Sequence, residues 1–254
     1  MEKNEDSVFK KIRKLLNNLE IEYNIQILFA IESGSRAWGF ESPNSDYDVR
    51  FVYCYPKSFY LSIDPITPAI TRMYENGTFD LNGWDIFKYA KLLVKSNPQT
   101  LEWVYSPIQY IPVNDSKLQE LTKYYFSQKA LFYHHYSLTK QNYNKFIENK
   151  SLVSPKKYLY CLRSYYSALF VLHHHDIPPI KFDELITKLG DKVAISEELE
   201  ELIKLKMSNK EDHKIKPILA INDLLKAFVA KEITLEGREV DTAPVNKWIN
   251  SILK

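Results

Sequence analysis

The chain has 254 residues, of which 45% are hydrophobic and 26% are charged, a composition typical of one large globular domain or two smaller ones. Its 34 basic and 32 acidic side chains give a net charge of +2, which excludes a histone-like polycation. Two cysteines, Cys54 and Cys161, are too few for a disulfide framework. The N-terminus is charged and no apolar run reaches about 18 residues, so we expect a cytoplasmic protein without a membrane segment.

Hydrophobic periodicity predicts a first half that mixes helices and strands. Apolar residues recur at helical spacing near the N-terminus, and short apolar or alternating runs that follow are typical of strands. In chain order we expect a helix over 8–19, strands over 25–32, 46–54 and 78–82, a helix from 85 to about 96, and a short helix from Pro98. A Pro-containing loop over 106–112 then leads to a domain boundary near Val113.

The second half reads as helical throughout. Expected helices cover 117–149 (one long helix or a pair), 155 to about 176, 182–189, 196–207, 217–230 and 245–253. The fold class is therefore α+β, with a small mixed β-sheet domain over 1–113 followed by an all-helical domain over 114–254. We expect the helical domain to close a cleft and to select a substrate, since ligands commonly bind between domains.

Two carboxylates on one strand carry the most chemical information. Alternation places Asp46, Asp48 and Arg50 on one face of the second strand. Neighbouring carboxylates repel each other and lose solvation, a cost that bound divalent cations offset. Hard oxygen ligands at this spacing suit Mg²⁺, and Asp80 on the third strand could supply another. Alternatively, the two acids are an ordinary surface pair at a strand end.

A small-residue turn about ten residues upstream favours the metal interpretation. Gly34 and Ser35 end the first strand, where backbone N–H groups and a hydroxyl can approach an anion closely. Arg36 adds a guanidinium that can form charge-assisted hydrogen bonds. A phosphate cradle and a metal pair joined by a short loop would together hold a polyphosphate. Trp38 in that loop either stacks on a nucleobase or anchors the loop.

These residues resemble a known signature. Ser-Gly-Ser-Arg at 33–36 with Asp-Tyr-Asp-Val at 46–49 resembles the Gly-Ser…Asp-h-Asp-h motif of the DNA polymerase β-like nucleotidyltransferase superfamily. The longer strings over 32–53 and 82–110 are similar to bacterial nucleotidyltransferases that include RNA-ligase-associated members. The resemblance is strong over about 25–112 and weak beyond. It implies a palm-like catalytic domain of the polymerase β type.

The resemblance also implies roles for individual acids. Asp46 and Asp48 would ligate two Mg²⁺ ions, with Mn²⁺ as an alternative, and Asp80 would ligate the catalytic ion and help deprotonate the acceptor hydroxyl. Asp85 competes for the place of third acid. We prefer Asp80, because it lies inside the strand pattern, whereas Asp85 resembles a helix cap.

Gly34 and Ser35 would hold the β- and γ-phosphates of a nucleoside triphosphate, again by resemblance. Arg36 and Arg50 are candidate phosphate clamps, and Arg50 could equally neutralise the carboxylates that share its face. Such a site suits in-line displacement at the α-phosphorus by a two-metal mechanism.

The sequence thus predicts a Mg²⁺-dependent nucleotidyltransferase that moves a nucleoside monophosphate from an NTP, such as ATP, to a hydroxyl acceptor and releases pyrophosphate. An RNA end is the leading acceptor, because of the resemblance to RNA-repair-associated proteins and the nine basic against three acidic residues within 114–170. A protein side chain or a small molecule are alternatives. The rival class is a non-catalytic relative that binds nucleic acid or protein. Nothing in the sequence selects the oligomeric state.

Overall fold

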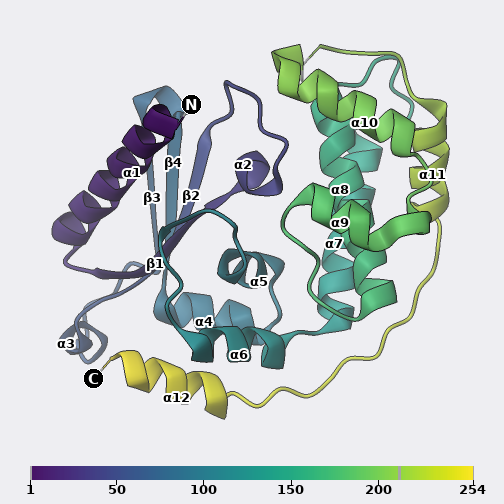
Figure 1. The fold of residues 1–254 in the computed structure, drawn as a ribbon. Coiled ribbons are helices and arrows are strands. Elements are labelled where there is room, and N and C mark those ends of the chain that lie inside the picture. Colours follow the sequence, from purple (N-terminus) through teal and green to yellow (C-terminus); the bar gives the residue numbers. More distant parts are fainter. Residues whose placement is uncertain (1, 211–212, 254) are drawn as a thin grey trace. The chain divides into compact units, whose positions relative to one another are not determined.

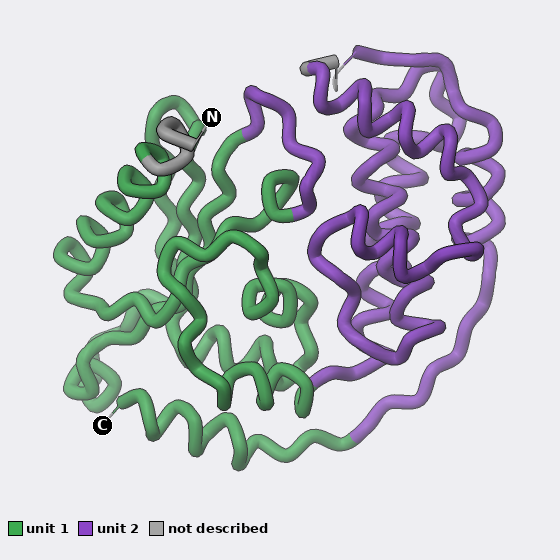
Figure 2. The backbone as a smooth tube through the Cα atoms, in the orientation of Figure 1, with its two compact units in different colours: residues 1–37, 46–125, 239–254 green, residues 38–45, 126–238 purple. Residues whose placement is uncertain are grey.

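The computed structural model describes residues 2–210 and 213–253, and the chain divides into two compact units (Figures 1 and 2). Unit 1 comprises residues up to 37, 46–125 and from 239 onwards, and unit 2 comprises 38–45 and 126–238. This division differs from a single boundary near residue 113: the first helix after that point and the C-terminal helix both belong with the sheet.

Unit 1 is built on a five-stranded sheet with the order β3-β4-β2-β1-β5. Its strands are β1 (Gln26–Ser33), β2 (Tyr47–Cys54), β3 (Ala69–Tyr74), β4 (Phe79–Asp85) and β5 (Gln109–Ile111). Strands β2 and β4 run parallel and the other pairs antiparallel, which confirms the predicted small mixed sheet. Strands β3 and β5 were not predicted: both lie at the edges of the sheet in segments that contain prolines, and β5 has only three residues.

Helix α1 (Glu2–Tyr23) covers one face of the sheet. Its buried residues Ile12, Leu16 and Leu19 join a hydrophobic cluster with Val49 and Phe51 of β2. Because side chains alternate along a strand, Asp48 and Arg50 project from the opposite face, as the sequence predicted. That face lies on the side of the sheet where α4 and α5 pack (Figure 1).

Four further helices complete unit 1: α4 and α5 contact the sheet, and α6 and α12 pack against these helices and each other. They are α4 (Ile86–Val94), α5 (Pro98–Val104), α6 (Ser116–Tyr125) and the C-terminal α12 (Ala243–Ile252), with short turns at α2 (Gly34–Trp38), α3 (Lys57–Tyr60) and η1 (Glu75–Gly77). Two polar contacts hold the C-terminal segment in place: Trp248 Nε1 donates to Asp115 Oδ2 at 2.7 Å, and Tyr125 Oη donates to the Asp241 carbonyl at 2.9 Å.

Unit 2 is a helical bundle centred on the long pair α7 (Gln128–Phe146) and α8 (Pro155–His174). Around it lie α9 (Phe182–Leu189), α10 (Ser196–Leu205) and α11 (Leu219–Val229), with short turns η2 (Gly190–Lys192) and η3 (Lys206–Lys210, of π type). The predicted helix pair over 117–149 is present as α6 and α7, separated where Ser127 caps α7 by accepting from the Ala130 N–H. Among the helices described, none is both long and apolar enough to cross a membrane.

Candidate functional site

The parallel pairing of β2 with β4 brings two of the predicted acids side by side. Asp48 stands directly opposite Asp80 in the register, and Ser33 at the end of β1 stands opposite Asp48 on its other side. Adjacent strands lie roughly 4.8 Å apart, so the two carboxylates emerge as neighbours on the same face. Asp46 is exposed and immediately precedes β2. The register therefore places Asp48 and Asp80 side by side near the starts of two inner strands, with Asp46 in the segment just before β2.

Arg50 bridges the paired carboxylates. Its Nη2 donates to Asp48 Oδ1 at 2.8 Å and to Asp80 Oδ2 at 2.9 Å, while its Nη1 donates to the Asp80 carbonyl at 3.1 Å. Burial raises the pKa of Asp48 and the charge of Arg50 opposes that rise, with Asp46 and Asp80 adding repulsion. The guanidinium thus supplies the positive charge that two adjacent, half-buried carboxylates require.

The predicted glycine–serine turn lies against Asp48. Gly34 has a φ of +64°, and a Cβ at this position would lie only 2.1 Å from Asp48 Oδ2. Glycine is therefore needed here both for its backbone conformation and for the close approach of the carboxylate. Ser35 is buried in the same turn. The two halves of the motif are in direct proximity, as their short spacing in the sequence predicted.

The side chain of Arg36 links the glycine–serine turn to the start of β2. Its Nε donates to the Asp46 carbonyl at 3.1 Å, and its guanidinium lies 3.9 Å from the centre of the Tyr47 ring. In unit 2, Trp38 packs edge-on against Tyr160 and receives the Arg163 guanidinium at 4.1 Å from its ring centre. Of the two interpretations of Trp38, these contacts favour the one in which its side chain anchors the loop.

Asp85, the competing third acid, lies elsewhere. It caps α4 by accepting from the Phe87 N–H at 2.9 Å, and it accepts from Tyr60 Oη at 2.5 Å. Its register partner on β2 is Tyr53, five residues beyond Asp48. The side chain is buried and its hydrogen bonds are those of a helix cap. The geometry therefore places Asp80, and not Asp85, next to Asp48.

Glu32, the penultimate residue of β1, was not predicted as a site residue although it contacts Asp48. Its carboxylate is fully buried: Oε1 accepts from the Asp48 N–H at 2.8 Å and Oε2 accepts from Tyr110 Oη at 2.5 Å. Burial raises the pKa of this carboxyl to about 7, against the opposing effect of these hydrogen bonds. The available signal was an acid at the end of an otherwise apolar strand, immediately before the Gly-Ser turn.

The carboxylate oxygens of the predicted acids provide some, but not all, of the ligands that a hard divalent cation requires. Aspartate oxygens are the ligands that Mg²⁺ prefers, and the absent Cβ of Gly34 lets Asp48 Oδ2 lie close to the main chain of the turn. Among the side chains that the structure describes, within 7–208 and 213–253, however, no three from His, Cys, Asp or Glu converge closely enough to hold an ion by themselves. An ion at these acids would need further oxygen ligands, which Mg²⁺ commonly takes from substrate phosphates.

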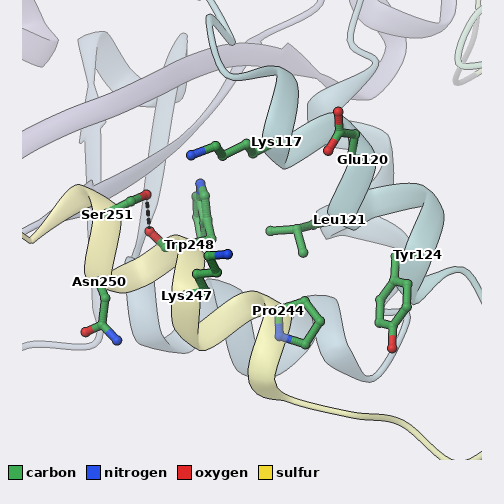
Figure 3. Close-up of a pocket in the computed structure, with 9 residues that line it drawn as sticks. All are labelled: Lys117, Glu120, Leu121, Tyr124, Pro244, Lys247, Trp248, Asn250 and Ser251. Carbon is green, nitrogen blue, oxygen red and sulfur yellow. Dashed lines mark hydrogen bonds between the residues drawn. The ribbon is translucent and has the colours of Figure 1, made fainter.

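A separate cavity of about 660 Å³ opens between α6 and α12 in unit 1 (Figure 3). Lys117 and Leu121 of α6 face Lys247 and Trp248 of α12 across it. None of the predicted site residues lines it.

Comparison with known proteins agrees with these motifs. Residues 8–252 match the family model described as "RNA repair pathway DNA polymerase beta family". The chain is 34% identical over 242 residues to "Uncharacterized protein YcgL" of Bacillus subtilis (strain 168), covering 92% of each chain. It is 26% identical over 157 residues to "Uncharacterized protein MJ0002" of Methanocaldococcus jannaschii, covering 57% of this chain and 60% of that protein.

Among solved structures, a nucleotidyltransferase-like protein from Exiguobacterium sibiricum 255-15 is similar at 15% identity, over 85% of this chain and 75% of that one. The TM-score of 0.31 is too low for this likeness to support an argument about fold or function.

Proposed function

The chain belongs to the RNA repair pathway DNA polymerase beta family, and from that membership we propose that it is a nucleotidyltransferase. It would transfer a nucleoside monophosphate from an NTP, such as ATP, to a hydroxyl acceptor with release of pyrophosphate. The observation that best supports this proposal is the pairing of Asp48 with Asp80 across parallel strands, with Gly34 packed against Asp48.

Asp46, Asp48 and Asp80 would hold Mg²⁺, as two ions, with Mn²⁺ as a substitute. When bound, the metal would stabilise negative charge on the attacking and leaving oxygens of the displacement. Asp80 would also accept the proton of the acceptor hydroxyl, which its place beside Asp48 and its partly exposed side chain permit. Positioning and charge supply most of the acceleration in phosphoryl transfer, so few further catalytic groups are required.

The turn over residues 34–36, which precedes β2, would bind the phosphates. Gly34 allows a close approach of the main chain to an anion, Ser35 offers a hydroxyl, and Arg36 is already held beside Asp46 by its hydrogen bond to the main chain. Arg50 would offset part of the charge of the two carboxylates while the triphosphate enters.

An RNA end is the acceptor that we favour. The family's association with RNA repair supports it, as does the basic surplus within residues 114–170, which would attract a polyanion. The helical residues 114–254 would select this acceptor. A protein side chain or a small hydroxylated molecule would be revealed by the same transfer assay.

A second candidate function is binding without catalysis. Arg50 bonds to one oxygen of Asp48 and one of Asp80, so a cationic side chain of the protein itself already offsets part of the negative charge of the carboxylate pair. Such a site could belong to a relative that retains the fold and binds nucleic acid or protein only.

Transfer of label from an α-³²P-labelled NTP to RNA, protein extract or small alcohols, in Mg²⁺, tests the proposal. We expect Asp48→Asn to abolish labelling while its circular dichroism and melting temperature remain those of a folded protein. Asp64→Asn, at an exposed loop acid, is the matched control and should label normally. Undiminished labelling by folded Asp48→Asn would refute the assignment, and no labelling of any acceptor by the unaltered chain would favour the binding function.

A further inference from the structure

A buried acid lies directly behind the proposed site, on the strand that neighbours Asp48. Glu32 has no exposed surface, and its two carboxylate oxygens accept from the Asp48 N–H at 2.8 Å and Tyr110 Oη at 2.5 Å. In the β1–β2 register Glu32 faces Val49, so its side chain reaches diagonally to the main chain of the preceding residue.

The main chain of Glu32 also forms hydrogen bonds, to the segment that leads into β5. Its main-chain N–H donates to the Ile108 carbonyl at 2.9 Å, and its carbonyl accepts from Ser106 Oγ at 2.6 Å. Tyr110 on β5, which bonds the side chain, is also buried. The carboxylate is therefore fixed by its own main chain and by β5, and it can in turn fix the residue that it contacts.

Asp48 depends on this contact more than a residue in the middle of a strand would. It lies near the start of β2, where its register partner is Ser33, the last residue of β1. At this end of the β1–β2 pair, the Asp48 N–H donates to the side-chain carboxylate of Glu32. Its carboxylate then meets Gly34 on one side and Arg50 on the other.

We propose that Glu32 is a positioning residue for Asp48: its buried carboxylate anchors the Asp48 amide and thereby fixes where the Asp48 carboxylate presents its oxygens to metal and triphosphate. The inference rests on the proposed nucleotidyl transfer, and it gives a role to a residue outside the Gly-Ser and Asp-x-Asp motif. Partners that orient a metal ligand commonly contribute 10–100-fold to metal affinity or activity.

The amide of glutamine can make both contacts, because its oxygen accepts from the Asp48 N–H and its nitrogen donates to the tyrosine oxygen. Methionine has a similar length but offers no comparable acceptor. Aspartate keeps the charge but is one methylene shorter. These three substitutions at position 32 separate the hydrogen bond from the charge and from simple filling of space.

The experiment measures Mn²⁺ binding to the intact chain by titration calorimetry with a non-hydrolysable NTP analogue present, together with kcat, the KM for NTP, and the melting temperature. We expect Glu32→Met and Glu32→Asp each to weaken Mn²⁺ binding and lower kcat by about 10–100-fold, with a smaller change in KM. We expect Glu32→Gln to retain most of both. Tyr110→Phe, which removes only the other partner of Glu32, should bind Mn²⁺ and turn over nearly normally even if its melting temperature falls.

Unaltered Mn²⁺ affinity and kcat in folded Glu32→Asp would overturn the inference, as would losses in Tyr110→Phe that match those in Glu32→Met. A folded Glu32→Gln as impaired as Glu32→Met would also overturn it, because charge and not the hydrogen bond would then matter. Asp48→Asn separates the two claims. If that variant is inactive while the position-32 variants are normal, the inference alone fails, whereas normal transfer by Asp48→Asn removes the proposed function and the inference together.

Discussion

Adding one methyl group at Gly34 tests the geometry of the site directly. A Cβ there would lie 2.1 Å from Asp48 Oδ2, whereas ordinary contact begins at 3.4 Å, so the carboxylate must retreat by 3.4 − 2.1 = 1.3 Å. The retreat would strain the 2.8 Å bond between Asp48 and Arg50. A misplacement of about 1 Å in a catalytic group can cost about 100-fold in rate. We therefore expect Gly34→Ala to lower kcat for nucleotidyl transfer by about 100-fold.

The fold should survive this change. A non-glycine residue with left-handed φ costs about 1–2 kcal/mol, which corresponds to a fall of roughly 2–8 °C in the melting temperature for a chain of this size. Gly77→Ala is the matched control, since Gly77 has a φ of +92° and a Cβ added there would meet nothing within 4 Å. It shares the backbone strain and lacks the clash with the carboxylate.

The assay is initial-rate transfer from labelled NTP at saturating Mg²⁺, normalised to folded protein, with thermal melting of both variants. A Gly34→Ala variant that transfers as fast as Gly77→Ala would refute the reasoning, because it would mean that the position of Asp48 beside the turn has no bearing on activity.

Two further perturbations test the core and the bundle. In Gly83→Ala the new Cβ would lie 2.1 Å from the ring of Phe51, so we expect a loss of about 1–3 kcal/mol in urea unfolding; stability equal to the unaltered chain would contradict the packing of β4 on β2. Burial, with smaller contributions from the charges of Arg163 and His134, holds the pKa of His135 well below its usual value, so the folded chain resists protonation of this imidazole. Its contribution to stability is therefore present above about pH 6.5 and is lost as pH falls, by at most about 1.4 kcal/mol per pH unit. His135→Gln should have a shallower acid dependence of the urea midpoint between pH 7.5 and 5.5, and equal slopes would disprove the assignment.

The local pattern of the sequence was sufficient for the elements that carry the site. Strand β2 was predicted because apolar and polar residues alternate along it, and the same alternation placed Asp48 and Arg50 together on the face away from α1. Strand β4 and the cap at Asp85 followed from a change of period between strand and helix. These are properties of fewer than ten consecutive residues, which a single sequence displays directly.

Pairing across long separations was not predictable in the same way. Strand β5 has three residues between two prolines, and it is defined by its bonding to β1, almost eighty residues earlier. The hydrogen bond that joins Tyr110 to Glu32 arises from that pairing, so the importance of Glu32 could not be recognised without it. Likewise, the C-terminal helix joins unit 1 through bonds such as that of Tyr125 to Asp241, which no local periodicity encodes.

The position of Arg50 links these observations to the chemistry. Two adjacent carboxylates on a half-buried strand face require a cation, and an arginine two residues from Asp48 supplies one from within the chain. Because Arg50 engages one oxygen of Asp48 and one of Asp80, an incoming metal ion must use the remaining oxygens or displace a guanidinium hydrogen bond. A triphosphate eases both requirements, since it brings oxygen ligands for the metal and an alternative anionic partner for the arginine. In the proposed reaction, metal and nucleotide would therefore bind more tightly together than either does alone.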